Sequence, residues 1–154
     1  MREILFRGKR NDNGEWVEGR NIHTVNNEDG EQMYIAQTDT PCAIFTSKEH
    51  SGVFMSSPAF RLIPETVGQC TDLTDKNGKK IFEGDICRFR EWSNGDMCWI
   101  GKVNYEHQQF VISGGKNKEC ATPFTIAMSR FIPENIEVIG NIHDNPELLK
   151  GGEG

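Results

Sequence analysis

The segment that constrains the fold most runs from Glu65 to Asp85 and reads E-T-V-G-Q-C-T-D-L-T-D-K-N-G-K-K-I-F-E-G-D. Its Asn77-Gly78 pair predicts a tight type I′ hairpin turn, because both central positions of that turn need positive φ and these residues adopt it at little cost. Gly84 lies between two β-like runs and predicts a bulge or a sharp bend. The segment is therefore expected to form a structural corner between strands.

The residues after this corner alternate in polarity, with Ile86 apolar and Arg88 and Arg90 polar. A period of two predicts a strand with one face on a core and the other in water. Sixteen glycines against six prolines favour many short elements over long helices. We expect a mainly β fold, with short-stranded antiparallel sheets or small barrels and little helix.

Other parts of the chain give weaker predictions of the same kind. Residues 2–7 and 15–19 predict an N-terminal hairpin, with Arg7, Lys9 and Arg10 entering its loop. Residues 37–57 predict a long loop with one or two short strands, and residues 121–132 are ambiguous between strand and helix. Further strands are expected at 32–36, 97–103, 109–112 and 136–142, a short helix at 144–150, and a frayed tail at 151–154.

Two sequence patterns recur in the same order. Residues 13–19 are echoed by residues 77–84, and R-L-I-P-E at 61–65 is echoed by R-F-I-P-E at 130–134. An internal duplication would explain this recurrence, and so would chance repetition of hairpin chemistry. We expect either two small β subdomains, at 1–70 and 71–150, or one compact domain.

The charge of the chain argues against a general affinity for nucleic acid. The net charge is −6, with 7 basic and 10 acidic residues through Thr71 and 10 and 13 after it, so each part carries −3. The start of the chain has no apolar run suited to a signal peptide, and no window suits a membrane span. A cytoplasmic protein with no membrane partner is expected.

The cysteines and histidines show no metal-binding pattern. The five cysteines are odd in number and lack a C-x-x-C pair, which fits reduced thiols, with Cys42 and Cys87 as small core residues. The histidines have no metal-ligand spacing. No metal and no cofactor is therefore expected. The residues concerned are Cys42, Cys70, Cys87, Cys98 and Cys120, and His23, His50, His107 and His143.

The charged and aromatic residues have structural interpretations as well as functional ones. An EF-hand loop around Gly78 is excluded, because Leu73 and Gly84 would stand where carboxylates are required. Glu83 and Asp85 could form a carboxylate pair, although a solvated acidic turn is favoured. Four aromatic residues could stack bases or sugars but are expected in the core: Trp92, Trp99, Tyr105 and Phe110.

Three segments together resemble the YopX family of phage and prophage proteins. They are residues 1–7, residues 65–86, and I-E-V-I-G-N-I-H-D-N-P-E-L-L at residues 136–149. The resemblance implies a small intracellular, phage-encoded, predominantly β protein that self-associates. It brings no established activity and no catalytic residues.

Three functional hypotheses follow. The first is a non-enzymatic phage accessory or assembly protein that acts through protein–protein contacts with itself or with a phage or host protein, as a homo-oligomer. The second is a nucleic-acid-binding β-barrel module that uses Arg7, Lys9, Arg10, Arg88 and Arg90. The third is an enzyme that uses Glu83 and Asp85, or an activated cysteine.

Overall fold

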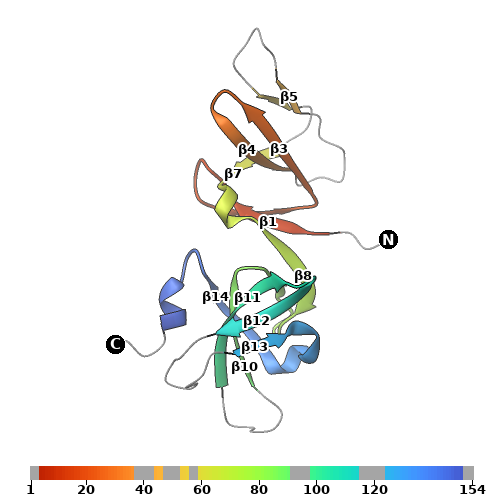
Figure 1. Ribbon diagram of the computed structural model, residues 1–154, viewed down its shortest axis with the longest axis vertical. Coiled ribbons are helices and arrows are strands. Elements are labelled where there is room, and N and C mark those ends of the chain that lie inside the picture. Colours follow the sequence, from red (N-terminus) through yellow and green to blue (C-terminus); the bar gives the residue numbers. More distant parts are fainter. Residues whose placement is uncertain are drawn as a thin grey trace. The chain divides into compact units, whose positions relative to one another are not determined.

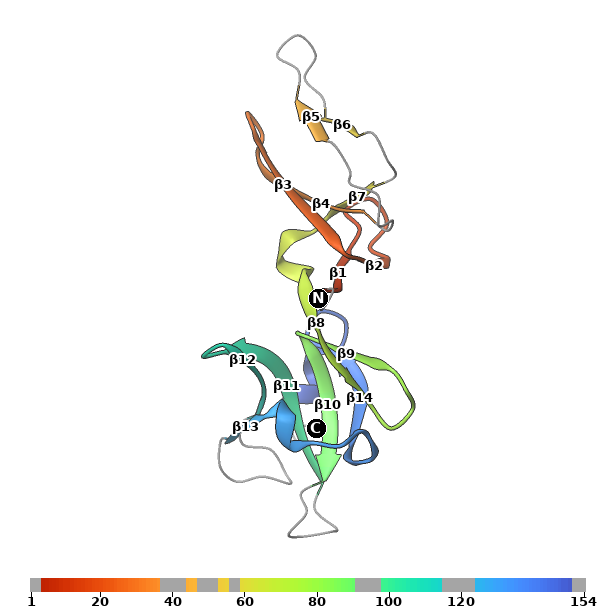
Figure 2. The ribbon, with the colours of Figure 1, turned by 90° about the vertical axis from the view of Figure 1, so that its right-hand side faces the viewer.

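The computed structural model describes residues 4–36, 44–46, 53–55, 59–90, 98–114 and 124–150. The chain divides into two compact units, unit 1 at Met1–Gln69 and unit 2 at Cys70–Gly154. None of the helices in the described ranges is long and apolar enough to cross a membrane. Each unit is built from antiparallel strands (Figures 1 and 2).

Unit 1 combines a hairpin with a three-stranded sheet. Its elements are β1 Phe6–Lys9, β2 Trp16–Gly19, β3 Asn21–Asn27, β4 Gly30–Ala36, β5 Ile44–Thr46, β6 Val53–Met55, β7 Ala59–Leu62 and the 3-10 turn η1 Pro64–Thr66. β1 pairs with β2, and β5 pairs with β6. β4 lies between β3 and β7, as Figure 1 shows.

The core of unit 1 forms where the hairpin packs on the sheet. Val17 of β2, Ile35 of β4 and Leu62 of β7 are buried together. Gly19 at the end of β2 is needed for this packing, because a Cβ there would meet the carbonyl oxygen of Ala36. The glycine therefore lets two strands approach backbone to backbone.

Strand β8, Gly68–Thr74, belongs to both units. Its first residues, Gly68 and Gln69, pair with β1, and its later residues pair with β9, Lys80–Phe82. Unit 2 continues with β10 Asp85–Arg90, β11 Cys98–Glu106, β12 Gln109–Gly114, β13 Phe124–Ala127, the 3-10 turns η2 Met128–Arg130 and η3 Pro133–Asn135, β14 Ile136–Asn141 and the 3-10 turn η4 Pro146–Lys150.

The main sheet of unit 2 has five strands in the order β13-β12-β11-β10-β14. Its inner face carries Cys87 and Phe89 from β10, Val103 from β11 and Ile112 from β12, all buried. Trp99 packs against this core and stacks edge-on to Phe124, with ring centroids 5.3 Å apart. Alternation along β10 leaves Arg88 and Arg90 exposed on the other face.

These elements confirm a mainly β fold of antiparallel sheets, and the sheets of the described residues are open rather than closed into barrels. The bend at Gly84 is confirmed, with φ +90. Cys87 is a core residue as expected, and Trp99 and Phe110 pack on the core. The ambiguous segment 121–132 contains β13 and η2, and the expected C-terminal helix is the 3-10 turn η4.

Other local predictions were wrong. Asn77 has no positive φ, so the turn is not type I′: Gly78 takes the left-handed conformation alone, at φ +77, and Asp75 holds the turn. Arg7 and Lys9 lie in β1 rather than in a loop. Tyr105 is 50% exposed, because its end of the β11–β12 hairpin extends beyond the core. Residues 21–27, for which no strand was expected, form β3.

Some expectations concern residues outside the described ranges. Cys42, Trp92, Cys120 and the expected frayed tail at 151–154 lie there, as does most of the expected 37–57 loop. One or two short strands were expected in that loop, and the structure has β5 and β6 there.

Candidate functional site

Two of the sequence segments that carry the YopX resemblance meet at the turn between β9 and β10. The backbone N–H of Gly84 donates to the carbonyl of Val103, and the N–H of Ile142 donates to the carbonyl of Gly84, both at 2.9 Å. Asn141 in turn accepts hydrogen bonds from the N–H groups of His143 and Asp144. The residues of the two segments thus hold one backbone corner together.

The two carboxylates of this turn have different environments. Asp85 is 1% exposed and accepts a hydrogen bond from the backbone N–H of Phe82 at 2.8 Å. Glu83 is half-buried, and burial raises the pKa of its carboxyl. The interpretation of both residues as a solvated acidic turn was therefore wrong for Asp85, which is buried. Asp85 supports the backbone, and Glu83 is the more accessible acid.

Asp75 is a third motif carboxylate that binds backbone. Its Oδ1 accepts from the N–H groups of Asn77 and Lys79, and its Oδ2 accepts from the N–H of Val138 at 3.0 Å. Burial acts to raise the pKa of Asp75, but these three donors outweigh it and lower the pKa below its usual value. The side chain thereby closes its own turn and binds the edge of β14.

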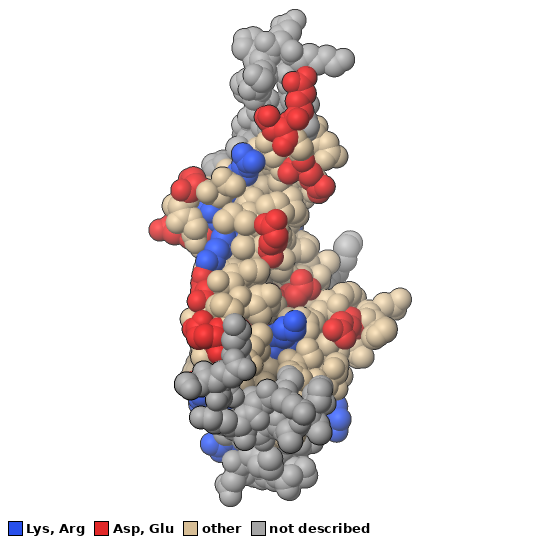
Figure 3. Space-filling view, turned by 60° about the vertical axis from the view of Figure 1, so that its left-hand side comes forward, with Lys and Arg blue, Asp and Glu red and all other residues tan. Residues whose placement is uncertain are grey.

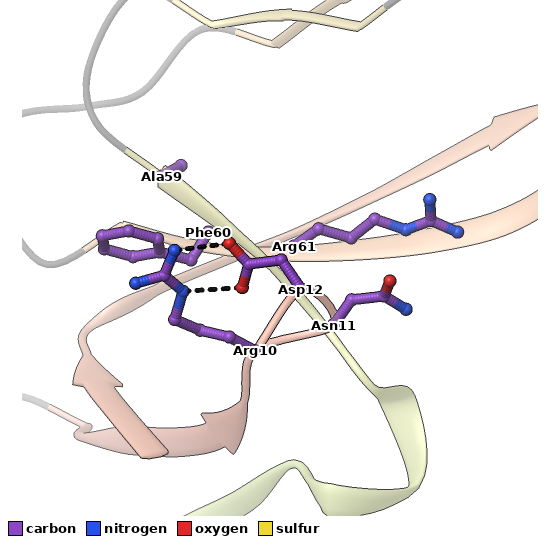
Figure 4. A pocket seen from close by; sticks show the side chains of 6 residues that line it. All are labelled: Arg10, Asn11, Asp12, Ala59, Phe60 and Arg61. Carbon is purple, nitrogen blue, oxygen red and sulfur yellow. Dashed lines mark hydrogen bonds and ion pairs between the residues drawn. The ribbon is translucent and has the colours of Figure 1, made fainter. Parts of the chain in front are cut away.

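A pocket of about 400 Å³ lies in unit 1, beside the tip of the β1–β2 hairpin. Arg10 makes two hydrogen bonds to Asp12, at 2.9 and 2.6 Å, and its guanidinium lies over the ring of Phe60, 4.3 Å from the ring centroid. Figure 4 shows this pair side by side, with the side chain of Arg61 extending away from it. The lining residues are Arg10, Asn11, Asp12, Ala59, Phe60 and Arg61.

Arg10 and Asp12 balance each other's charge in this pocket. The hydrogen bonds from Arg10 lower the pKa of Asp12, so the Asp12 carboxyl is ionised at neutral pH. A guanidinium that already makes two hydrogen bonds to a carboxylate has fewer N–H donors left for a phosphate. The pocket lining also contains Arg61, whose side chain extends away from this pair.

The five cations predicted for nucleic-acid binding fall into three places. Arg7 and Lys9 lie over the ring of Trp16, at 4.6 and 5.4 Å from its centroid. Arg10 lies in the pocket with Asp12. The remaining two, Arg88 and Arg90, are exposed on β10 in unit 2.

Arg88 and Arg90 have a basic neighbour that sequence reasoning missed. Lys102 pairs with Ile86 across β10 and β11, so it shares the outer sheet face with both arginines. The pairing partner of Arg88 on the other side is Glu137, which forms an ion pair with Lys76 at 3.2 Å. Alternation along β11 alone could not show this. It places Lys102 on the same face as the two arginines only when the pairing register between β10 and β11 is known.

The tip of the β11–β12 hairpin carries a second exposed feature. Tyr105 and Phe110 pair across the strands, with ring centroids 4.9 Å apart. The turn between them has two non-glycine residues at positive φ, His107 at 49° and Gln108 at 66°. Phe110 also packs on the core, so Tyr105 is the exposed ring of this pair, and an exposed tyrosine is suited to contact with another protein.

Comparisons with known proteins agree with this architecture. The chain is similar to the crystal structure of protein EF1440 from Enterococcus faecalis, with a TM-score of 0.51 and 24% sequence identity over 95% of this chain and 97% of that one. This likeness concerns the fold. No curated protein matches the chain. The sequence model of the YopX protein family matches residues 5–150, and the chain therefore belongs to the YopX family.

Proposed function

We propose that this chain is a phage- or prophage-encoded, non-enzymatic accessory or assembly protein. It acts in the cytoplasm through protein–protein contacts, and it forms a homo-oligomer. Membership of the YopX family supports the phage origin only through the resemblance described above. The structural support comes from the carboxylates in the segments that resemble the family, because these carboxylates bind backbone N–H groups.

The observation that carries the proposal is the engagement of the motif carboxylates with backbone. Asp75 accepts three backbone hydrogen bonds, and Asp85 accepts one from Phe82 while 1% exposed. A general acid or base must reach a substrate proton. These carboxylates instead stabilise turns and a strand edge, which suits a scaffold whose surfaces make the functional contacts.

The proposal is tested by the molar mass of the purified protein in solution. Size-exclusion chromatography with light scattering is run over a dilution series and at several salt concentrations. A defined species heavier than the 17.4 kDa chain supports homo-oligomeric assembly. A monomer at every concentration and salt would contradict self-assembly and leave only contacts with a different protein.

A second candidate function is nucleic-acid binding through the outer face of β10 and β11. Its support is the shared exposure of Arg88, Arg90 and Lys102 on one sheet face. The net charge of −6 opposes it, and Figure 3 shows basic side chains in small groups among acidic and uncharged residues. This candidate therefore ranks below assembly.

Fluorescence anisotropy with labelled single- and double-stranded oligonucleotides tests this second candidate. The Arg88→Ala and Arg90→Ala double variant should lose binding, with a shallower dependence on salt. Arg130→Ala is the matched control, because Arg130 is also exposed in unit 2. Absence of binding by the wild-type protein at low salt would end this candidate.

A further inference from the structure

Strand β3 forms an edge of the three-stranded sheet in unit 1. It pairs with β4 in an unbroken register of seven residue pairs, from Asn21↔Ala36 to Asn27↔Gly30. Among the described residues, β4 is the only strand that pairs with β3, and the short strand β5 lies near β3 but pairs with β6. Figures 1 and 2 both draw β4 on one side of β3, between β3 and β7. An edge strand of this length presents a row of backbone groups that another strand can bind.

The opposite edge of the same sheet is occupied. Leu62 of β7 forms an isolated antiparallel β-bridge with Arg10. On either side of it, the N–H of Asn11 donates to the carbonyl of Arg61, and the N–H of Ile63 donates to the carbonyl of Lys9. The loop of the β1–β2 hairpin therefore covers this edge.

The edge at β14 in unit 2 is also occupied. The N–H of Lys76 donates to the carbonyl of Ile136, and the N–H of Val138 donates to the carboxylate of Asp75. The other outer strands of the described residues are short: β2 and β13 have four residues each, and β5, β6 and β9 have three each. Proteins commonly protect edges by covering or shortening them, so β3 is the exception among the strands in the described ranges.

The sequence of β3 also lacks the usual protective residues. N-I-H-T-V-N-N contains no proline, no lysine and no acidic residue, and its register with β4 has no bulge. Charged residues stand only outside its two ends, with Arg20 directly before the strand and Glu28 directly after it. Both side chains are exposed.

This arrangement is complementary to itself. If two copies of β3 pair antiparallel about a two-fold axis at Thr24, position 20 of one copy lies opposite position 28 of the other. Each Arg20 then meets the Glu28 of its partner, and the two exposed Thr24 residues face each other. Threonine pairs and opposite charges stabilise cross-strand contacts, and no like charges are brought together.

We propose that β3 is a homodimer interface, in which β3 of one copy pairs antiparallel with β3 of a second copy around Thr24. The two three-stranded sheets join into one of six strands in the order β7-β4-β3-β3-β4-β7. The partner is a second copy because the charges that flank β3 complement each other under two-fold symmetry. This inference deepens the proposed function, since it rests on homo-oligomerisation and names the surface that produces it.

A charge-swap series tests this pairing. The Arg20→Glu and Glu28→Arg single variants should each weaken dimerisation about tenfold, measured by sedimentation velocity over a dilution series, because each places like charges opposite each other. The Arg20→Glu/Glu28→Arg double variant should recover the wild-type dissociation constant. The two positions lie at opposite ends of β3, roughly 26 Å apart at strand spacing, so a contact within one chain cannot explain the recovery.

A second variant acts at the centre of the interface. Thr24→Lys places two lysines against each other at the two-fold axis and should abolish the dimer. Thr125→Lys is the matched control, because Thr125 is an exposed threonine on an edge strand of unit 2. Circular dichroism shows whether each variant is folded. If Thr24→Lys is unfolded, the charge-swap series alone tests the β3 interface.

The outcomes separate this inference from the proposed function. A wild-type protein that is monomeric at every concentration contradicts both. An oligomer that persists unchanged in Thr24→Lys and in the charge reversals retains the proposed function but overturns the β3 interface. Loss in the single variants with recovery in the double variant supports the interface.

Discussion

The carboxylate of Asp75 accepts a hydrogen bond from the backbone N–H of Val138, which lies 63 residues further along the chain, at 3.0 Å. The same carboxylate closes the turn that follows β8 through the N–H groups of Asn77 and Lys79. One side chain therefore joins the turn after β8 to the edge strand β14. This relationship explains why a carboxylate at this position stabilises unit 2.

The first prediction concerns Asp75→Asn. The amide keeps one acceptor but presents an N–H₂ group to at least one backbone donor, so the variant should lose about 2 kcal/mol of unfolding free energy at pH 7. Denaturant unfolding followed by circular dichroism measures the loss. Asp12→Asn is the control, because that carboxylate is exposed and should cost much less.

The lowered pKa of Asp75 also predicts how the stability difference between wild type and Asp75→Asn changes with pH. The pKa of Asp75 is lowered in the folded state, so its contribution is present above the unfolded pKa of about 3.9 and is lost as pH falls through the lower, folded value. The difference between wild type and Asp75→Asn should therefore shrink on acidification below pH 4. An unchanged difference in that range would contradict the role of the ionised carboxylate.

Glu83 should behave in the opposite way. Burial raises the pKa of Glu83, so its ionised form is less favourable in the folded state, and its cost to folding appears as pH rises through the folded pKa. Glu83→Gln should raise the unfolding free energy at pH 7, by less than about 1 kcal/mol because the group is half-exposed and screened. At a pH below the unfolded pKa the two proteins should be equally stable. Destabilisation by the glutamine at pH 7 would show that the carboxylate makes a favourable contact.

Gly19 should tolerate no side chain. A Cβ at this position would clash with the carbonyl oxygen of Ala36, and backbone cannot move aside as a flexible side chain can. Gly19→Ala should therefore lower the unfolding free energy by about 3 kcal/mol. Gly8→Ala is the matched comparison, because its Cβ would meet only the end of the Leu62 side chain. Equal costs for both variants would contradict the close backbone approach.

Substitutions in the turn at the tip of the β11–β12 hairpin should stabilise the folded protein. His107 and Gln108 both have positive φ, which costs a non-glycine residue about 1–2 kcal/mol. Replacing them by Asn and Gly, the pair suited to such a turn, should raise the unfolding free energy by about 1 kcal/mol. Thermal unfolding measures the gain, and Gln108→Val, which worsens the same strain, should have the opposite sign. A loss of stability on introducing Asn-Gly would contradict this backbone geometry.

The sequence predicted the fold where its signals were local. Alternation from Ile86 to Arg90 gave the exposed arginines of β10, and Gly84 gave the bend, because both depend on a few neighbouring residues. Tyr105 was misplaced for a related reason. It shares its sheet face with buried Val103, and alternation cannot tell where the core ends along a hairpin.

Other features depend on distant partners. The pocket around Arg10 needs Phe60, and the environment of Asp75 needs Val138, so no local pattern shows either. Strand β3 was missed because its apolar residues, Ile22 and Val25, are three apart and lie on opposite faces. An edge strand carries a weaker pattern than a central one, and its position at the edge is visible only in the sheet.

Hydrogen exchange of the β3 backbone tests the central claim most directly. The amides of residues 21–27 that point away from β4 are compared at high and low protein concentration. The proposed pairing predicts that these amides become protected at high concentration and exchange quickly on dilution, while the amides of β14, bound within the chain, do not change. Exchange of β3 that is independent of concentration, in a sample shown to be oligomeric, would contradict assembly through this strand.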